Sequence, residues 1–197
     1  MYRISNIMKN IGTKILRLRP SGFAQNDNGG VISSSHCGRA VRNDKLKKFV
    51  LVLPNIRSAH NVGAMFRTAD GAGVDKIYLC GYSPVPPHPQ LDKVSLGAEK
   101  TVPFEFCKQT GRVLTKLKKM GYNIIALEQT KSSVDIFDFS PVWPLALIVG
   151  NEKTGVTKAQ LKYCDGSIEI PMRGHKNSLN VSVAAGVAMY HLANKRA

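Results

Sequence analysis

The chain has 197 residues, of which 43% are hydrophobic, and its formal net charge is +15. This length and apolar content support one good hydrophobic core rather than two large ones, and no apolar run reaches the 18 residues of a membrane span. So large a positive charge favours a polyanionic partner, most often nucleic acid; the alternative is a merely soluble basic protein. The four cysteines lie far apart without a C-x-x-C pair, which argues against a zinc site or disulfide framework and predicts a reducing compartment.

The N-terminal quarter of the chain differs in residue composition from the rest. Residues 1–19 have apolar residues at near-helical spacing, Arg and Lys between them, and no acidic residue, a pattern typical of an organellar transit segment. We favour a basic tail that contacts nucleic acid, or an upstream-extended start, and hence a cytoplasmic protein. Residues 20–44 are rich in Gly, Asn and Ser, which predicts a linker. We therefore expect a basic, partly flexible extension over residues 1–48 and one globular domain over residues 49–197.

From residue 49 onward, short apolar runs alternate with helical patterns. The runs predict strands at residues 49–53, 76–80, 103–106, 123–127, 145–149 and 167–170. The helical patterns cover residues 62–72, 111–120, 157–163 and 179–194, and we expect Asn61 and Thr157 to cap the first and third of these helices. Strands that are apolar throughout, alternating with helices, predict an α/β fold with a mostly parallel sheet and helices on both faces.

Three polar segments each follow one of the apolar runs. They are residues 61–69, residues 150–155 and residues 170–180. In parallel sheets, ligands bind at the carboxyl ends of the strands, and all three segments fall on that edge. We therefore expect them to form one composite site.

Several familiar motifs fail on these segments. Residues 150–155 are not a phosphate loop, because Val156 stands where the loop requires lysine. The G-x-G at residues 71–73 precedes a strand instead of following one, unlike a dinucleotide fingerprint. Ser178 lacks the G-x-S-x-G context of serine hydrolases, and the histidines have no metal-ligand spacing, so we expect no metal. With no obvious nucleophile or metal, the site suits the positioning of two substrates for direct transfer.

In order along the chain, the three segments resemble the motifs of the SpoU-type (TrmH-like) RNA ribose 2′-O-methyltransferases of the SPOUT superfamily. The first reads Asn61-Val-Gly-Ala-Met-Phe-Arg67-Thr-Ala, the second Gly150-Asn-Glu152-Lys-Thr-Gly, and the third Ile170-Pro-Met with Ser178-Leu-Asn180-Val-Ser-Val-Ala-Ala-Gly. The resemblance covers about residues 49–193. It implies a C-terminal trefoil knot whose loops bind S-adenosylmethionine, and a homodimer whose active site draws residues from both subunits.

The resemblance also implies roles for individual residues in methyl transfer to a ribose 2′-oxygen. Arg67 is implied as the catalytic arginine. Deprotonating an arginine at neutral pH costs roughly 7 kcal/mol, so we expect Arg67 to anchor an RNA phosphate and stabilise the developing alkoxide, and we leave the proton acceptor open. Glu152 is expected to hold Arg67 or the loop backbone. The family places Ser178 and Asn180 in the catalytic site, although both could instead cap the last helix. Asn61 is the fifth residue of the implied catalytic set.

Two further groups of residues are expected to hold the ligands. The implied cofactor residues are Leu127, Gly150, Ile170, Met172, Ser178 and Leu179. The expected RNA contacts are Arg57, Arg173, His175 and Lys176, together with the basic N-terminal segment.

The substrate is less sharply indicated than the chemistry. Compact members of this family mostly act on tRNA and larger ones often on rRNA, and residues 1–48 are too short and polar for a separate RNA-binding domain, so we favour tRNA over rRNA. Two alternatives stay open: a non-catalytic RNA-binding or assembly protein that retains the fold, and an RNA base methyltransferase. Titration with S-adenosylmethionine separates the first of these from an enzyme.

Overall fold

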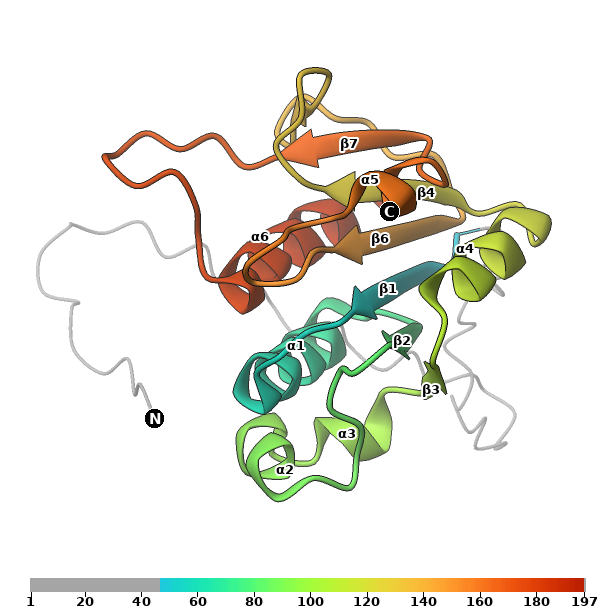
Figure 1. The fold of residues 1–197 in the computed structure, drawn as a ribbon, viewed down its shortest axis with the longest axis vertical. Coiled ribbons are helices and arrows are strands. Elements are labelled where there is room, and N and C mark those ends of the chain that lie inside the picture. The colour runs from blue at the N-terminus through green and yellow to red at the C-terminus, as the bar shows by residue number, and fades with distance from the viewer. Residues whose placement is uncertain (1–46, 197) are drawn as a thin grey trace, which may run out of the picture. The chain divides into compact units, whose positions relative to one another are not determined.

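A seven-stranded sheet, parallel throughout, organises the chain in the computed structural model, which describes residues 47–196 (Figure 1). The strand order is β3-β2-β1-β6-β4-β7-β5, so β1 and β6 lie in the middle. The strands are β1 (Phe49–Pro54), β2 (Lys76–Cys80), β3 (Phe104–Cys107), β4 (Asn123–Leu127), β5 (Val134–Asp135), β6 (Leu145–Val149) and β7 (Gly166–Glu169). The predicted α/β fold with a parallel sheet is confirmed.

Two hydrophobic cores, one on each face of the sheet, hold the layers together. Along β1, Phe49, Leu51 and Leu53 contribute to one core while Val50 and Val52 contribute to the other. Every residue of β1 and β6 is buried, as alternation of side chains across a doubly covered sheet requires. This burial explains why the sequence of these strands is apolar without interruption.

Helices cover both faces of the sheet, as predicted. The first core is closed by α1 (Ala59–Ala72), α2 (Pro89–Ser95), α3 (Ala98–Thr101) and α6 (Val181–Asn194). The second core is closed by α4 (Thr110–Lys119), with Leu161 of the short helix α5 (Lys158–Leu161) packed against it. Close approach of α1 and α6 is possible because small residues meet there: a Cβ on Gly186 would lie 3.5 Å from Thr68 Cγ2.

The N-terminal caps of α1, α5 and α6 can be compared with the predictions, and the cap of α1 differs from the predicted one. The helix α1 begins at Ala59, and the Ser58 side chain caps it by accepting the Asn61 backbone N–H at 3.3 Å. The prediction that Asn61 caps this helix is therefore wrong, because the Ser58 hydroxyl, three residues earlier, takes that place. Thr157 caps α5 in a capping box with Gln160, as predicted. Asn180 caps α6 through the Ser182 N–H at 2.9 Å, and Ser178 does not.

Some expectations lie outside the described residues or stay predictions. The helical pattern at residues 1–19 and the linker at residues 20–44 fall outside the described part of the chain. The trefoil knot implied by the resemblance stays a prediction. Within residues 47–196, no helix combines the length and apolar character needed to cross a bilayer.

Candidate functional site

A pocket of about 540 Å³ lies where the carboxyl ends of β4, β6 and β7 meet. The loops that follow these strands line it together with the start of α6. Its volume is within the range of small-molecule sites. The structure brings together all six residues predicted to hold a cofactor, because each of them lines this pocket: Leu127, Gly150, Ile170, Met172, Ser178 and Leu179.

The loop after β6 is shaped by two glycines. A Cβ on Gly150 would lie 2.3 Å from the Gly155 carbonyl carbon and 2.4 Å from the Val156 nitrogen, so only glycine fits there. Gly155 adopts a positive φ of 62°, a conformation that costs other residues energy. Between them, Asn151 and Gly155 exchange two backbone hydrogen bonds, of 3.2 and 2.9 Å. The result is a tight, closed loop that forms one wall of the pocket.

Glu152 extends from this loop to the beginning of α1. Its carboxylate accepts the backbone N–H of Arg57 at 3.0 Å and that of Ser58 at 3.1 Å. It also accepts the side-chain amide of Asn61 at 3.0 Å. The N-terminal end of a helix presents unpaired N–H groups and a partial positive charge, which is where a carboxylate is stabilised. Of the two predicted partners, Glu152 therefore holds the loop backbone and not Arg67.

The same contacts set the ionisation of Glu152. Partial burial raises the pKa of its carboxyl group, but the hydrogen bonds from the Arg57 backbone, the Asn61 side chain and the Ser58 backbone outweigh burial and bring the pKa below its ordinary value. Glu152 is thus held as an anion at neutral pH. A fixed anion at this position locks the second polar segment to the first.

Asn61 and Asn180 join the third segment to the other two. The Asn180 amide donates to Asn61 Oδ1 at 3.3 Å, while the Asn61 amide donates to Glu152. The Asn180 Oδ1 atom accepts both the N–H and the hydroxyl of Ser182, so its orientation is fixed. Residues that are 91 and 119 positions apart in sequence therefore form one chain of hydrogen bonds. The composite site expected from the three segments is present.

Arg67 lies outside this pocket. It is exposed on α1, and its side chain makes no hydrogen bond or ion pair with any described residue. The side chains of the four predicted RNA contacts are likewise exposed at the same edge of the sheet: Arg57, Arg173, His175 and Lys176. Residues 171–179 form no backbone hydrogen bond with any residue between 47 and 196. The third segment thus carries free polar groups beside the pocket.

The family model of the SpoU rRNA methylases matches residues 48–190, most of the chain. The protein belongs to the SpoU methylase family. A protein of Staphylococcus saprophyticus assigned to the TrmH family of tRNA/rRNA methyltransferases is 36% identical over 153 residues, which are 78% of this chain and 61% of that relative. The chain thus spans about three fifths of that relative's length.

Solved structures share the SpoU-family fold. The A. aeolicus TrmH/SpoU tRNA modifying enzyme is 31% identical with a TM-score of 0.70, over 76% of each chain. The methyltransferase AviRb from Streptomyces viridochromogenes, solved with AdoMet, is 24% identical with a TM-score of 0.71, over 77% of this chain and 58% of AviRb. A protein studied for 2-OH methylation of C/U34 on tRNA is 24% identical with a TM-score of 0.68, over 76% and 96% of the two chains.

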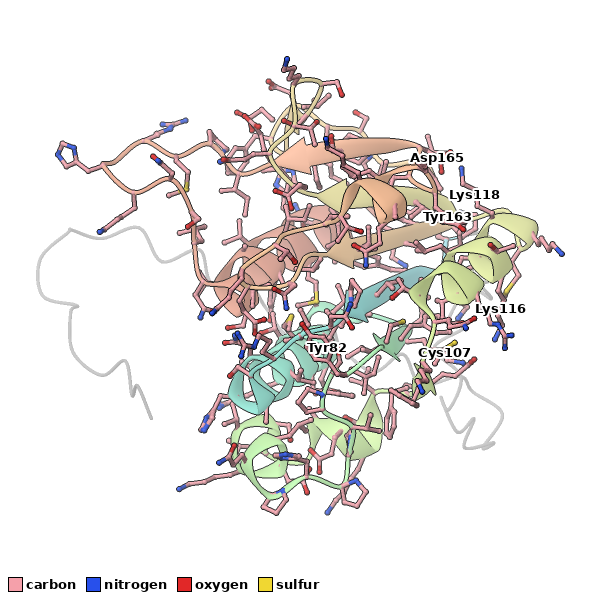
Figure 2. The ribbon with its side chains drawn as sticks, in the orientation of Figure 1. Tyr82, Cys107, Lys116, Lys118, Tyr163 and Asp165 are labelled. Atoms are coloured by element: carbon pink, nitrogen blue, oxygen red, sulfur yellow. The ribbon has the colours of Figure 1, made fainter. Side chains whose placement is uncertain are left out.

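Three residues that support the site of this SpoU-family chain were not found from sequence. Glu128 follows β4 and accepts the Val156 N–H at 2.6 Å, which fixes the far end of the glycine loop. Asn151 is buried, and its amide donates to the Tyr82 hydroxyl at 3.0 Å. Tyr82 itself, labelled in Figure 2, is 61% exposed, and its backbone N–H donates to Asn55 Oδ1 at 3.3 Å in the loop between β1 and α1. Glu128 follows the strand that carries Leu127, which was a usable signal, whereas nothing in the sequence connects Tyr82 to Asn151.

Proposed function

We propose that this protein transfers a methyl group from S-adenosylmethionine to a ribose 2′-oxygen of RNA, with tRNA as the favoured substrate. The observation that carries the proposal is the hydrogen-bonded chain Glu152–Asn61–Asn180, which joins all three family segments at the edge of one pocket. The chemistry is in keeping with the relatives, which include a tRNA modifying enzyme and a protein studied for 2-OH methylation of tRNA.

The pocket has the chemistry to hold S-adenosylmethionine, as AviRb holds AdoMet. Apolar side chains of Leu127, Ile170 and Leu179 line it and provide a slot for an adenine ring. The unpaired backbone groups of residues 171–179 can bond the polar edges of the ligand. When bound, this ligand supplies an electrophilic methyl group.

Arg67 acts on the acceptor in this proposal. Because arginine stays protonated at neutral pH, its guanidinium anchors an RNA phosphate and stabilises negative charge as the 2′-oxygen becomes nucleophilic. Ser178 and Asn180 line the pocket at the start of α6, where they face the reacting ribose. Arg57, Arg173, His175 and Lys176 hold the RNA around this point. Glu152 and Asn61 fix the relative position of the segments.

A homodimer completes the site in this proposal. The helix α6 exposes Val183, Val187 and Tyr190, which recur at helical spacing and form an apolar stripe. Contiguous apolar surface of this kind marks interaction sites. Arg67 lies on α1 next to Thr68, and Thr68 packs against Gly186 of α6, the helix that carries the stripe. A second copy docked on the stripe therefore brings its own Arg67 toward the pocket that lacks one.

The test is incubation with methyl-labelled S-adenosylmethionine and separate tRNA and rRNA pools, followed by alkaline hydrolysis. Methylation of a 2′-oxygen removes the group that attacks the neighbouring phosphate, so the label is expected in alkali-resistant dinucleotides from the tRNA pool. Label in mononucleotides would instead identify a base methyltransferase. No transfer to either pool, together with no S-adenosylmethionine binding by calorimetry, would leave a non-catalytic RNA-binding protein.

Two glycine variants test the ligand pocket by calorimetry. Gly150→Ala forces a Cβ against the loop backbone and is expected to weaken S-adenosylmethionine binding by roughly tenfold or more. Gly166→Ala, at the start of β7, is the matched control, because a Cβ there would lie 3.6 Å from Ile125 Cδ1, an ordinary van der Waals contact. Equal affinity of the two variants would contradict the pocket assignment.

A further inference from the structure

The surface formed by α4 and α5 carries a concentrated positive charge. Residues 105–119 and 157–165 contain seven Lys or Arg residues and only two acidic ones, Glu105 and Asp165. Glu105 pairs with Lys76 at 2.7 Å and Lys116 at 3.1 Å, and Asp165 pairs with Lys118. The other cations are exposed and make no ion pair with any described residue: Lys108, Arg112, Lys119, Lys158 and Lys162. We call this the α4–α5 surface.

An open hollow of about 740 Å³ lies in the α4–α5 surface. Arg112, Lys116 and Lys119 of α4 line it together with Tyr163 from the segment after α5. Figure 2 labels Lys116 and Tyr163 on these two elements. Gly111 lies next to Tyr163: a Cβ at that position would lie 3.3 Å from the Tyr163 hydroxyl. The hydroxyl end of the tyrosine therefore rests against the first turn of α4, and three cations of α4 line the same hollow.

The α4–α5 surface is continuous with the catalytic edge along the chain. Residues 150–155 form a wall of the pocket and lead directly into α5 and Tyr163. Lys153 lines the pocket, and Lys158 and Lys162 lie between it and Tyr163 in the sequence. The chain segment between the pocket wall and the hollow thus carries three cations.

We infer that the α4–α5 surface binds the sugar-phosphate backbone of the substrate RNA away from the methylated nucleotide, and that Tyr163 stacks on one unpaired base in the hollow. The inference rests on the proposed function. Unpaired cations bind phosphates and release condensed counterions, and an aromatic ring among cations is the arrangement that holds single-stranded segments. The surface therefore extends the RNA contact beyond the residues around the pocket.

The charge component is tested with Arg112→Gln/Lys119→Gln against Lys93→Gln/Lys100→Gln. The control pair removes the same charge from exposed positions on α2 and α3. RNA affinity is measured by fluorescence anisotropy over a salt series. We expect the slope of log Kd against log salt to fall by about 2 in the first variant, about 1 for each lost phosphate contact, and the KM for RNA to rise roughly tenfold. The kcat at saturating RNA and the affinity for S-adenosylmethionine stay unchanged.

The stacking component is tested with Tyr163→Leu and Tyr163→Phe. The leucine variant loses the ring and is expected to bind RNA at least about fivefold more weakly, whereas the phenylalanine variant keeps wild-type affinity. Equal losses in both variants would overturn stacking.

The outcomes separate this inference from the proposed function. If the wild-type protein methylates RNA but the α4 variant behaves like the α2–α3 control, the α4–α5 surface is not an RNA contact while the proposed function stands. If the wild-type protein neither binds nor methylates RNA, both fail. Binding of the wild-type protein, but not the α4 variant, to phosphatidylserine vesicles without any change in RNA affinity would replace RNA with a membrane surface.

Discussion

The two helical layers on the sheet differ most in charge. The helices α1 and α6 contain only two formally charged residues, Arg67 and Asp70, and they expose the apolar stripe of Val183, Val187 and Tyr190. On the opposite face, α4 alone carries Arg112 and three lysines in ten residues. Both layers bury a hydrophobic core, so the difference lies in what each presents outward.

This contrast indicates two kinds of partner for one domain. An uncharged apolar stripe is suited to a second protein surface, since desolvating it costs little. A face with unpaired cations repels a second copy of itself and attracts a polyanion. The pocket lies at the edge shared by both layers, so a dimer and an RNA can reach it without competing for the same surface. The following predictions test this division.

The largest effect is expected for Arg67→Ala, which removes the one Lys or Arg residue of α1 and α6. Methyl transfer should fall by roughly 10²–10³-fold or more, because the variant lacks the positive charge that stabilises the developing alkoxide. Calorimetry should show nearly unchanged affinity for S-adenosylmethionine. Arg112→Ala is the control on the opposite layer and should keep kcat at saturating RNA. A collapse of cofactor affinity in Arg67→Ala would show that the assigned role is wrong.

The next effect concerns the apolar stripe. In Val187→Asp, a carboxylate in each copy meets its equivalent at the proposed dimer interface, and like charges there cost several kcal/mol. Sedimentation velocity should show the dimer dissociation constant rising by at least roughly 100-fold, with loss of methyl transfer at low protein concentration. Lys119→Asp places the same charge on the basic layer and should leave the sedimentation coefficient unchanged. A wild-type protein that is monomeric at all concentrations would refute the shared site.

A pair of glycine variants tests packing in the two layers. A Cβ on Gly63 of α1 would lie 2.6 Å from the Leu91 backbone oxygen of α2, so Gly63→Ala should destabilise the fold by about 1–3 kcal/mol. A Cβ on Gly111 of α4 meets only the movable Tyr163 ring, and alanine favours helix. Gly111→Ala should therefore be neutral or stabilising by about 0.5 kcal/mol in urea unfolding. Destabilisation of both by the same amount would contradict the difference in packing.

The smallest effect is a pH dependence that arises at two carboxylates. The Glu152 pKa is lowered on folding despite partial burial, because the carboxylate accepts hydrogen bonds from α1. Its stabilising contribution is therefore present above the unfolded pKa near about 4.3 and is lost as pH falls through the lower folded value. Glu152→Gln should lower the unfolding free energy at pH 7 by about 1 kcal/mol and flatten its fall below about pH 4.

Glu105→Gln is the matched variant on the basic layer. Hydrogen bonds from Lys76 and Lys116 lower the Glu105 pKa, so its contribution has the same sign and should be screened by salt. Only Glu152→Gln should also reduce methyl transfer, since Glu152 holds the segments of the site together. Equal activity of the two variants would remove Glu152 from the site.

Most strands of the sheet could be predicted from the sequence, because strands that are buried on both faces appear in it as continuous apolar runs. It missed β5, which has two residues, and the short helices α2 and α3, which have no side-chain cap. The three-residue error at the start of α1 arose because Asn61 and Ser58 are both good capping residues, and only the structure shows that Asn61 is engaged with Glu152 and Asn180. Five of the six pocket residues lie in the family motifs, and the resemblance also implied Leu127. Tyr82, in contrast, acts through a contact with Asn151 that no local pattern encodes.

The unpaired backbone of residues 171–179 has a consequence for measurement. Amide protons without hydrogen-bond partners exchange with solvent deuterium rapidly, while the hydrogen-bonded amides of β7 and α6 on either side exchange only through opening. A ligand that bonds these amides slows their exchange without any change elsewhere in the sheet. Hydrogen–deuterium exchange of the third polar segment therefore measures ligand binding to the pocket directly. The measurement needs neither a labelled ligand nor turnover of substrate.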